Sequence, residues 1–356
     1  MKNMDRILLV SVLAILAMGL VALYSASREY RFQDIFFRQV FWILIALALL
    51  FLILQIDYQK FMSISYLLYA INIILLLLVL FFGKARGGAH RWISMGPVNL
   101  QPSELAKITL VLALASYMAR RKRAVHGMGF FAGAAFLVLP VFFLIVIEPD
   151  LGTALLLIPV ALAMLFAAGV RMRYFAGVAF MGLLSIPFFW YFLRDYQKQR
   201  LFVFLNPNID PLGSGYTVIQ SKIAVGSGGI LGKGWLSGTQ NQLNFLPERH
   251  TDFIFSVVGE EWGFFGALVL ILLYMIVAQR SIKIAETTPD IYGKLVVTGF
   301  ITLFSLQAII NIGMTMGLLP VVGLTLPLIS YGGSSLVATV VCIAFILNIG
   351  MRRPLF

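Results

Sequence analysis

The stretch FLPERHTDFIF, residues 245–255, places four ionisable side chains directly before a long apolar run: Glu248, Arg249, His250 and Asp252. An aspartate among such groups can act as a general base that takes a proton from an attacking hydroxyl. It can also be a helix N-cap, which stabilises a helix by about 1 kcal/mol. A cap needs only one oxygen and leaves the neighbouring charges unexplained, so the stretch indicates a site for chemistry.

Two further carboxylates, Glu260 and Glu261, follow within the same apolar run. In a helix they lie about 12 to 13 Å beyond Asp252. Without partners or water, each would cost several kcal/mol inside a membrane. The three carboxylates together predict a polar cavity that opens outward, with Asp252 at its mouth.

Basic residues that can hold an anion lie in two long segments between apolar runs, about 83–103 and 194–251. One part of the second segment is rich in glycine, whose backbone can turn amides toward a phosphate while lysine supplies charge. A flexible, partly re-entrant loop explains the glycine-rich part equally well. Contact with anionic lipid headgroups is the less favoured alternative for the basic residues. The candidate substrate-binding residues are Arg200, Lys222, Lys233, Glu248, Arg249, His250 and Arg91.

The elements that must position these groups are membrane helices. The chain has 356 residues, of which 60% are hydrophobic and 12% are charged, whereas about a quarter are charged in soluble domains. Long apolar runs predict an all-α integral membrane fold, a single polytopic domain over 1–356. The ten expected spans are 7–24, 35–55, 61–82, 104–120, 128–147, 151–169, 174–193, 252–278, 294–319 and 329–350.

The positions of basic residues predict the orientation of these spans. Short connections at 120–123, 171–173 and 280–283 are basic and fall on one side together with both termini. The positive-inside rule makes that side cytoplasmic. The large loop between the seventh and eighth spans is then extracytoplasmic, and so is the candidate site.

Three other segments have a structural and a functional interpretation. In QPSELAK, Glu104 and Lys107 are three residues apart and share a helix face, as an ion pair that is either structural or functional. In EPDLGTAL, Asp150 is expected to cap the following helix. GLTLPLISYGGSS predicts a broken helix beside a central cavity, with packing through small residues as the alternative.

Metal and disulfide chemistry find no support in the sequence. The single cysteine, Cys342, cannot form an intrachain disulfide. Three scattered histidines have no metal-ligand spacing, so no metal residues are identified.

Five segments in order resemble the SEDS family (shape, elongation, division and sporulation), integral membrane glycosyltransferases that polymerise lipid II into peptidoglycan. They are GARGGAHRWISMGPVNLQPSELAK, EPDLGTAL, RLFVFLNP, NFLPERHTDFIFSVVGEEWG and LPVVGLTLPLISYGGSS. The stretch FLPERHTDFIF is most similar to the elongation member. The division member is the near alternative.

The resemblance implies that Asp252 is the catalytic base, which deprotonates the 4-hydroxyl of an acceptor sugar while undecaprenyl pyrophosphate leaves the donor. It also implies lipid II and nascent glycan as ligands, and a class B penicillin-binding protein as partner. A divalent cation, Mg²⁺ or Mn²⁺, is implied as a possible aid. The implied location is the bacterial cytoplasmic membrane, with no nucleic acid among the partners.

Two other functions compete with this interpretation. A lipid II flippase would also need a polar cavity and broken helices, but a transporter centres its site at the midplane, usually between inverted repeats. A scaffold that recruits cell-wall enzymes would leave the buried carboxylates unexplained.

Overall fold

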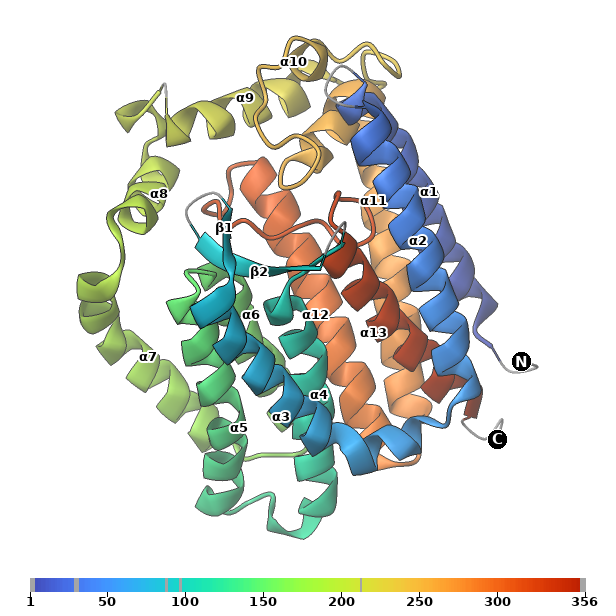
Figure 1. Cartoon of the computed structure of the whole chain (residues 1–356), viewed down its shortest axis with the longest axis vertical. Coiled ribbons are helices and arrows are strands. Elements are labelled where there is room, and N and C mark those ends of the chain that lie inside the picture. The colour runs from blue at the N-terminus through green and yellow to red at the C-terminus, as the bar shows by residue number, and fades with distance from the viewer. Residues whose placement is uncertain (1–3, 29–31, 87–88, 96–97, 212, 353–356) are drawn as a thin grey trace.

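The computed structural model describes residues 4–28, 32–86, 89–95, 98–211 and 213–352. Ten long helices run through this part of the chain at the predicted positions (Figure 1). They are α1 (Arg6–Ser27), α2 (Phe32–Gln55), α3 (Tyr58–Phe82), α4 (Pro102–Arg120), α5 (Met128–Ile147), α6 (Leu151–Ala167), α7 (Met172–Phe192), α11 (Ile254–Thr287), α12 (Ile291–Thr315) and α13 (Gly333–Arg352).

The fold class is therefore confirmed as an all-α membrane protein. Eight of the ten helices in the described residues are long and apolar enough to cross a bilayer. The other two are α6, which has 17 residues, and α4, which carries Glu104 and Lys107. Among the eight, α12 and α13 are the most enclosed, whereas α7 buries none of its residues.

The connection between α3 and α4 folds as a small antiparallel sheet, which the sequence analysis did not predict. Its strands are β1 (Lys84–Arg86), β2 (Ala89–Met95) and β3 (Val98–Leu100), in the order β1-β2-β3. Strand β2 carries Arg91 to the same end of the bundle as the 194–251 segment, as Figure 1 shows.

The 194–251 segment contains further helices rather than an open loop. They are α8 (Asp195–Leu205), a 3-10 turn at Pro207–Ile209, α9 (Ser214–Ser227) and α10 (Thr239–Gln242). These elements lie across one end of the bundle, away from both chain termini (Figure 1). Arg200 lies on α8 and Lys222 on α9.

The segment between α12 and α13, residues 316–332, is not helical. It contains Pro320 and Pro327, and α13 begins only at Gly333. Despite its irregular backbone, the segment is packed inside the protein, with Leu326 and Ile329 each 1% exposed. The expected broken helix is therefore not observed: the segment is a long non-helical connection, and residues 329–332, predicted to begin the last span, lie outside α13.

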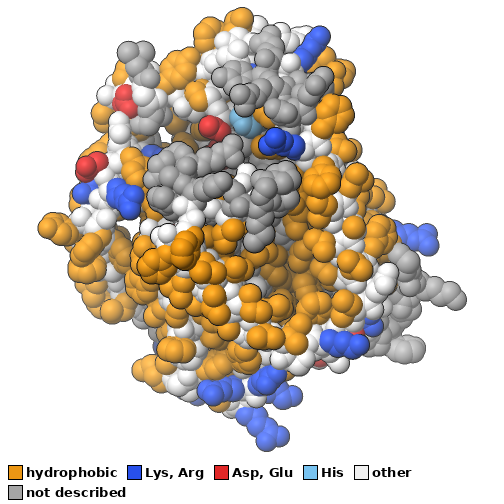
Figure 2. Space-filling view, in the orientation of Figure 1, with side chains coloured by type: hydrophobic (Ala, Val, Ile, Leu, Met, Phe, Trp, Pro, Cys, Tyr) orange, Lys and Arg blue, Asp and Glu red, His pale blue; other side chains and the backbone are white. Residues whose placement is uncertain are grey.

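The surface divides into zones along the bundle. Figure 2 shows a broad hydrophobic band, with lysine and arginine side chains gathered at the lower edge of the molecule. The exposed apolar side chains include Phe81 on α3 and Phe136 on α5, at 79% and 76% exposure. This pattern suits a lipid-facing belt bounded by a charged end.

Candidate active site

Asp252 lies in the turn at residues 247–253, directly before α11. Three backbone carbonyls of this turn are held by distant groups. The Nδ2 of Asn311 donates to the carbonyl of Asp252 at 2.9 Å. The hydroxyl of Ser330 donates to Thr251 at 2.5 Å, and the amide of Tyr331 donates to His250 at 2.8 Å. The 316–332 segment and α12 therefore fix the backbone of the turn.

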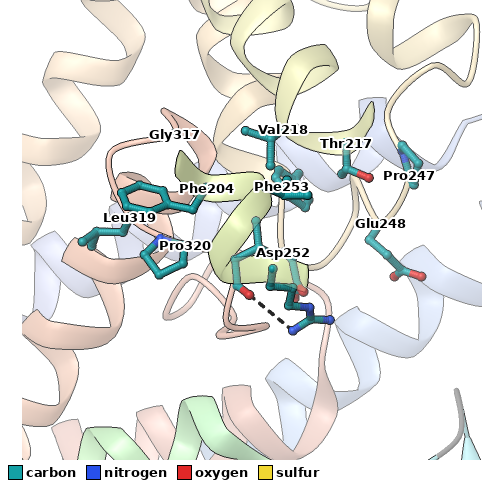
Figure 3. A pocket seen from close by; sticks show the side chains of 13 residues that line it. Phe204, Thr217, Val218, Pro247, Glu248, Asp252, Phe253, Gly317, Leu319 and Pro320 are labelled. Atoms are coloured by element: carbon teal, nitrogen blue, oxygen red, sulfur yellow. Dashed lines mark hydrogen bonds between the residues drawn. The ribbon is translucent and has the colours of Figure 1, made fainter. Parts of the chain in front are cut away.

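The side chain of Asp252 does not cap α11. The N-cap of this helix is Phe253, and no side chain makes the cap hydrogen bond. Asp252 is instead half-buried and lines a pocket of about 190 Å³ (Figure 3). Its carboxylate is thus available for another task.

The pocket is amphipathic. Its polar groups include Asp252, Glu248 and the guanidinium of Arg200, whose Nη1 donates to the carbonyl of Val321 at 3.3 Å. Apolar side chains form the remaining wall, and Figure 3 shows Phe204, Val218, Phe253, Leu319 and Pro320 around Asp252. Such a pocket suits a ligand that combines polar and apolar parts.

Burial is the main cause that raises the pKa of Asp252 to about 6, and the nearby carboxylate of Glu248 adds to it. Arg200 and Arg91 lower this pKa, while Asp150 raises it. A pKa near neutrality suits a general base, because the group is deprotonated yet still attracts a proton.

Arg91 and Asp150 brace the turn between α5 and α6 beside this pocket. The Nε of Arg91 donates to the carbonyl of Glu148 at 3.0 Å, and its Nη2 also donates to Pro149. The Nη1 of Arg91 lies 3.9 Å from Asp150 Oδ1. Asp150 accepts from the amide of Thr153 at 3.4 Å, so it caps α6 as predicted. The guanidinium of Arg91 is therefore bound to groups of the protein in the turn between α5 and α6.

The two lysines predicted to bind substrate together are not brought together. Lys222 is exposed and packs against Gly317, which lines the Asp252 pocket. Lys233 instead makes an ion pair with Glu260 at 2.8 Å and donates to Thr239. Lys233 is thus already paired with a carboxylate of the protein, and its role in anion binding stays a prediction.

Arg249 and His250 are not among the residues that line the Asp252 pocket. Arg249 is buried, and its Nε donates to the carbonyl of Ala26 at the end of α1 at 2.8 Å. The His250 ring lies 6.0 Å from that of Tyr331. Both residues tie the turn to the rest of the protein, and their role in substrate binding stays a prediction.

The predicted cavity with Glu260 and Glu261 is likewise not observed. Glu260 is fully buried and accepts from Lys233 and from the amide of Gln240 at 3.0 Å. Glu261 accepts from the hydroxyl of Ser25 and from Nδ2 of Asn241. Both carboxylates anchor the glycine-rich segment to α11 and α1, and neither lines the Asp252 pocket.

Glu104 and Lys107 form an ion pair inside the bundle. Lys107 Nζ lies 2.7 Å from Glu104 Oε2, and the two residues are 1% and 6% exposed. The pair neither lines the Asp252 pocket nor touches its turn. Its position is that of a structural pair on α4.

Sequence reasoning missed two parts of the site. One is Asn311, a buried amide within the apolar run of α12. The other is the wall formed by Gly317, Leu319, Pro320 and Val321. A lone amide in an apolar span was the available signal for Asn311, since polar groups at membrane depth need partners.

The described residues do not form a metal site. Within them, no group of three or more His, Cys, Asp or Glu side chains could hold a metal ion. The side chains present therefore do not fit a cation held by the protein alone.

Comparison with known proteins shows the family of the chain. A family model described as cell cycle protein, FTSW_RODA_SPOVE, matches residues 5–354. The chain belongs to the FtsW, RodA and SpoVE family. Peptidoglycan glycosyltransferase MrdB of Escherichia coli K12 is 39% identical over 358 residues, covering 99% of this chain and 95% of that protein.

Two solved structures of similar proteins share the fold. One, described as structural coordination of polymerization and crosslinking by a peptidoglycan synthase complex, has a TM-score of 0.86 at 37% identity and full coverage of both chains. Rod shape determining protein RodA of Thermus thermophilus has a TM-score of 0.75 at 32% identity, covering 98% of this chain and 97% of that one.

Proposed function

We propose that the Asp252 pocket is where this peptidoglycan glycosyltransferase joins lipid-linked sugars into a glycan strand. The observation that carries the proposal is a carboxylate free of any cap role, half-buried, with its pKa raised to about 6, opposite Arg200. The family membership and the similarity to MrdB support the glycosyltransferase activity.

In the proposed reaction, the Asp252 carboxylate takes the proton of the acceptor sugar's 4-hydroxyl. That oxygen forms a bond to C1 of the donor sugar, and the bond from C1 to the pyrophosphate oxygen breaks. The α-linked donor becomes a β-1,4 linkage, and polyprenyl pyrophosphate departs. A positioned base contributes about 10²- to 10⁴-fold in rate.

Arg200 and Lys222 are the cations placed to hold the donor's pyrophosphate, because one lines the pocket and the other packs on its wall at Gly317. The apolar wall suits the start of the lipid chain. Because the described residues offer no protein cation site, no step of the mechanism is routed through a metal.

Lipid II is the substrate that fits this chemistry, and the pocket is assigned to the extracytoplasmic side. The basic short connections at the opposite end support that orientation.

Cysteine at Asn208, exposed in the 194–251 segment, should react with an impermeant thiol reagent in intact protoplasts, whereas cysteine at Gln59 should react only after lysis. Reversed labelling would contradict the orientation.

A transpeptidase of the class B penicillin-binding type is the proposed partner, since a similar chain belongs to a complex that coordinates polymerization and crosslinking. We further propose a role in elongation, supported by similarity to a rod shape determining protein. Rescue of elongation-deficient cells, but not of division-deficient cells, is the expected result. Rescue of division alone would assign the other role.

Asp252→Asn tests the proposed base. Asparagine keeps the shape but has no basic oxygen, so polymerisation of lipid II by the purified protein should fall at least a hundredfold. Because Asp252 makes no cap bond, thermal stability should stay close to that of the wild type. Glu248→Gln is the matched control on the same turn and should retain most activity. Near-normal polymerisation by Asp252→Asn would contradict the assignment.

A further inference from the structure

Six exposed cations form one surface at the end of the bundle opposite the Asp252 pocket. We call it the cationic surface. It consists of Arg120, Arg121, Lys122, Arg123, Arg171 and Arg173. The α4–α5 and α6–α7 connections that carry it are joined, since the hydroxyl of Tyr174 donates to the carbonyl of His126 at 3.3 Å. The ring of Tyr174 also stacks on Phe131 at 5.4 Å.

No carboxylate in the described part of the chain forms an ion pair with this surface. Between residues 105 and 194 the chain has only two acidic residues, Glu148 and Asp150. Both lie at the other end of α5 and α6, beside Arg91. Within the described residues, none of the six cations takes part in an ion pair.

Aromatic rings hold three of the guanidinium groups in place without cancelling their charge. Arg120 lies 5.6 Å from the ring centre of Tyr66, Arg121 lies 5.1 Å from that of Tyr117, and Arg173 lies 4.9 Å from that of Tyr174. Such contacts orient an arginine but leave it with full positive charge. Three arginines of the cationic surface are therefore held in place by aromatic rings, and its positive charge is not balanced by ion pairs within the described residues.

The other half of the same end differs, because two of its three described arginines are paired and only Arg6 is not. Arg280 lies 2.6 Å from Asp5, and Arg352 lies 3.5 Å from Asp57. Membrane orientation needs an excess of basic residues, but it does not need them unpaired and gathered on one side. The uncompensated charge on α4–α7 thus calls for an external anion.

We propose that the cationic surface binds the headgroups of anionic phospholipids in the adjoining leaflet. The side chains bordering it are apolar and exposed, with Met128 at 70%, Phe166 at 64% and Met172 at 65%. Figure 2 shows basic side chains at the lower edge below the hydrophobic band. A cation cluster beside an apolar belt matches a ligand with a charged head and acyl chains, as in basic sites near helix ends. A soluble acidic protein could bind the cations, but it would make no use of the exposed apolar side chains beside them, which acyl chains can contact.

The test compares two triple variants with equal charge change. The first variant combines Arg121→Gln, Arg123→Gln and Arg173→Gln. The control combines Lys60→Gln, Lys283→Gln and Lys294→Gln, exposed lysines at the same end that each lie within four residues of a carboxylate: Asp57, Glu286 and Asp290. Native mass spectrometry of each protein titrated with phosphatidylglycerol or phosphatidylcholine measures retained lipid.

We expect the wild type to prefer phosphatidylglycerol, and the first variant to lose about a hundredfold in its affinity, which is about 3 kcal/mol. The control should lose much less. Equal losses in both variants, or no preference over phosphatidylcholine, would overturn the proposal. Equally tight binding of soluble glycerol phosphate would assign the surface to a free phosphate instead. Polymerisation activity is measured separately and does not enter this result.

Discussion

The amide of Asn311 bridges two backbone carbonyls, donating to Asp252 at 2.9 Å and to Leu324 at 2.7 Å. Asn311 is fully buried on α12, whereas Leu324 lies in the non-helical 316–332 segment. One side chain therefore joins the turn that carries the proposed base to the segment behind it. The position of Asp252 depends on this bridge rather than on any bond to its own side chain.

Asn311→Ala should slow polymerisation by lowering kcat more than tenfold, with little change in KM, because the base loses its alignment. It should also cost about 1–3 kcal/mol of stability, since two buried carbonyls lose their donor. The matched control is Asn348→Ala, a buried asparagine on α13 that donates to Ile53 and Ile56 far from the pocket. It should lose stability but retain its rate per folded molecule. Equal rate losses in both variants would contradict the positioning role.

The activity should depend on pH through Asp252. A base works when deprotonated, so the rate should fall as the pH drops through its pKa of about 6. Arg200 lowers this pKa, so Arg200→Gln should move the acidic limb of the profile to higher pH. Glu248 raises it, so Glu248→Gln should move that limb to lower pH. Shifts in the same direction for both variants would exclude Asp252 as the titrating group.

Lys222 and Lys233 should separate by their effects, although both flank the glycine-rich segment. Lys222→Ala should raise the KM for lipid II and leave the melting temperature nearly unchanged, because this lysine is exposed beside the pocket. Lys233→Ala should lower the melting temperature, because buried Glu260 loses a cation at 2.8 Å and about 1–3 kcal/mol with it. Thermal unfolding in detergent and steady-state kinetics distinguish the two. If Lys233→Ala changed only the KM for lipid II and not the melting temperature, the predicted role of Lys233 in substrate binding would be supported.

The Glu104–Lys107 pair should show strong coupling. Removing either charge leaves the other buried and unpaired, at a cost of about 3–5 kcal/mol. The combined Glu104→Gln and Lys107→Met variant should therefore be more stable than the sum of the single changes predicts. A double-mutant cycle on thermal unfolding measures the coupling energy. Additive losses would show that the two side chains act independently.

Helix positions could be predicted closely from the sequence because hydropathy reports directly on membrane burial. The expected runs 128–147 and 35–55 match α5 and the main part of α2. Two parts of the 316–332 segment, 316–319 and 329–332, were assigned to helices because the sequence there is apolar. The segment contains Pro320 and Pro327, which disfavour a continuous helix, and much of it is packed inside the protein.

The charged residues were harder to assign, because sequence spacing reveals a pair only when its members share a helix. Glu104 and Lys107 meet this condition, and they do pair. Lys233 and Glu260 are 27 positions apart and meet only because the glycine-rich segment folds back on α11. Glu260 and Glu261, which were predicted to line a cavity, are instead bound by residues that are distant in the sequence. No local sequence pattern indicates such contacts.

Helix α7 leads directly into α8, the element that carries Arg200, yet α7 buries none of its residues. Most of the surface of α7 is open to lipid, although Tyr174 near its start stacks on Phe131, so we expect the tilt of α7 to respond to the thickness of the bilayer. In a thicker or thinner membrane, a change in the tilt of α7 would move α8, and with it Arg200, relative to Asp252. Bilayer thickness thereby becomes a physical variable of the pocket, able to widen or narrow it with no change in the amino-acid sequence.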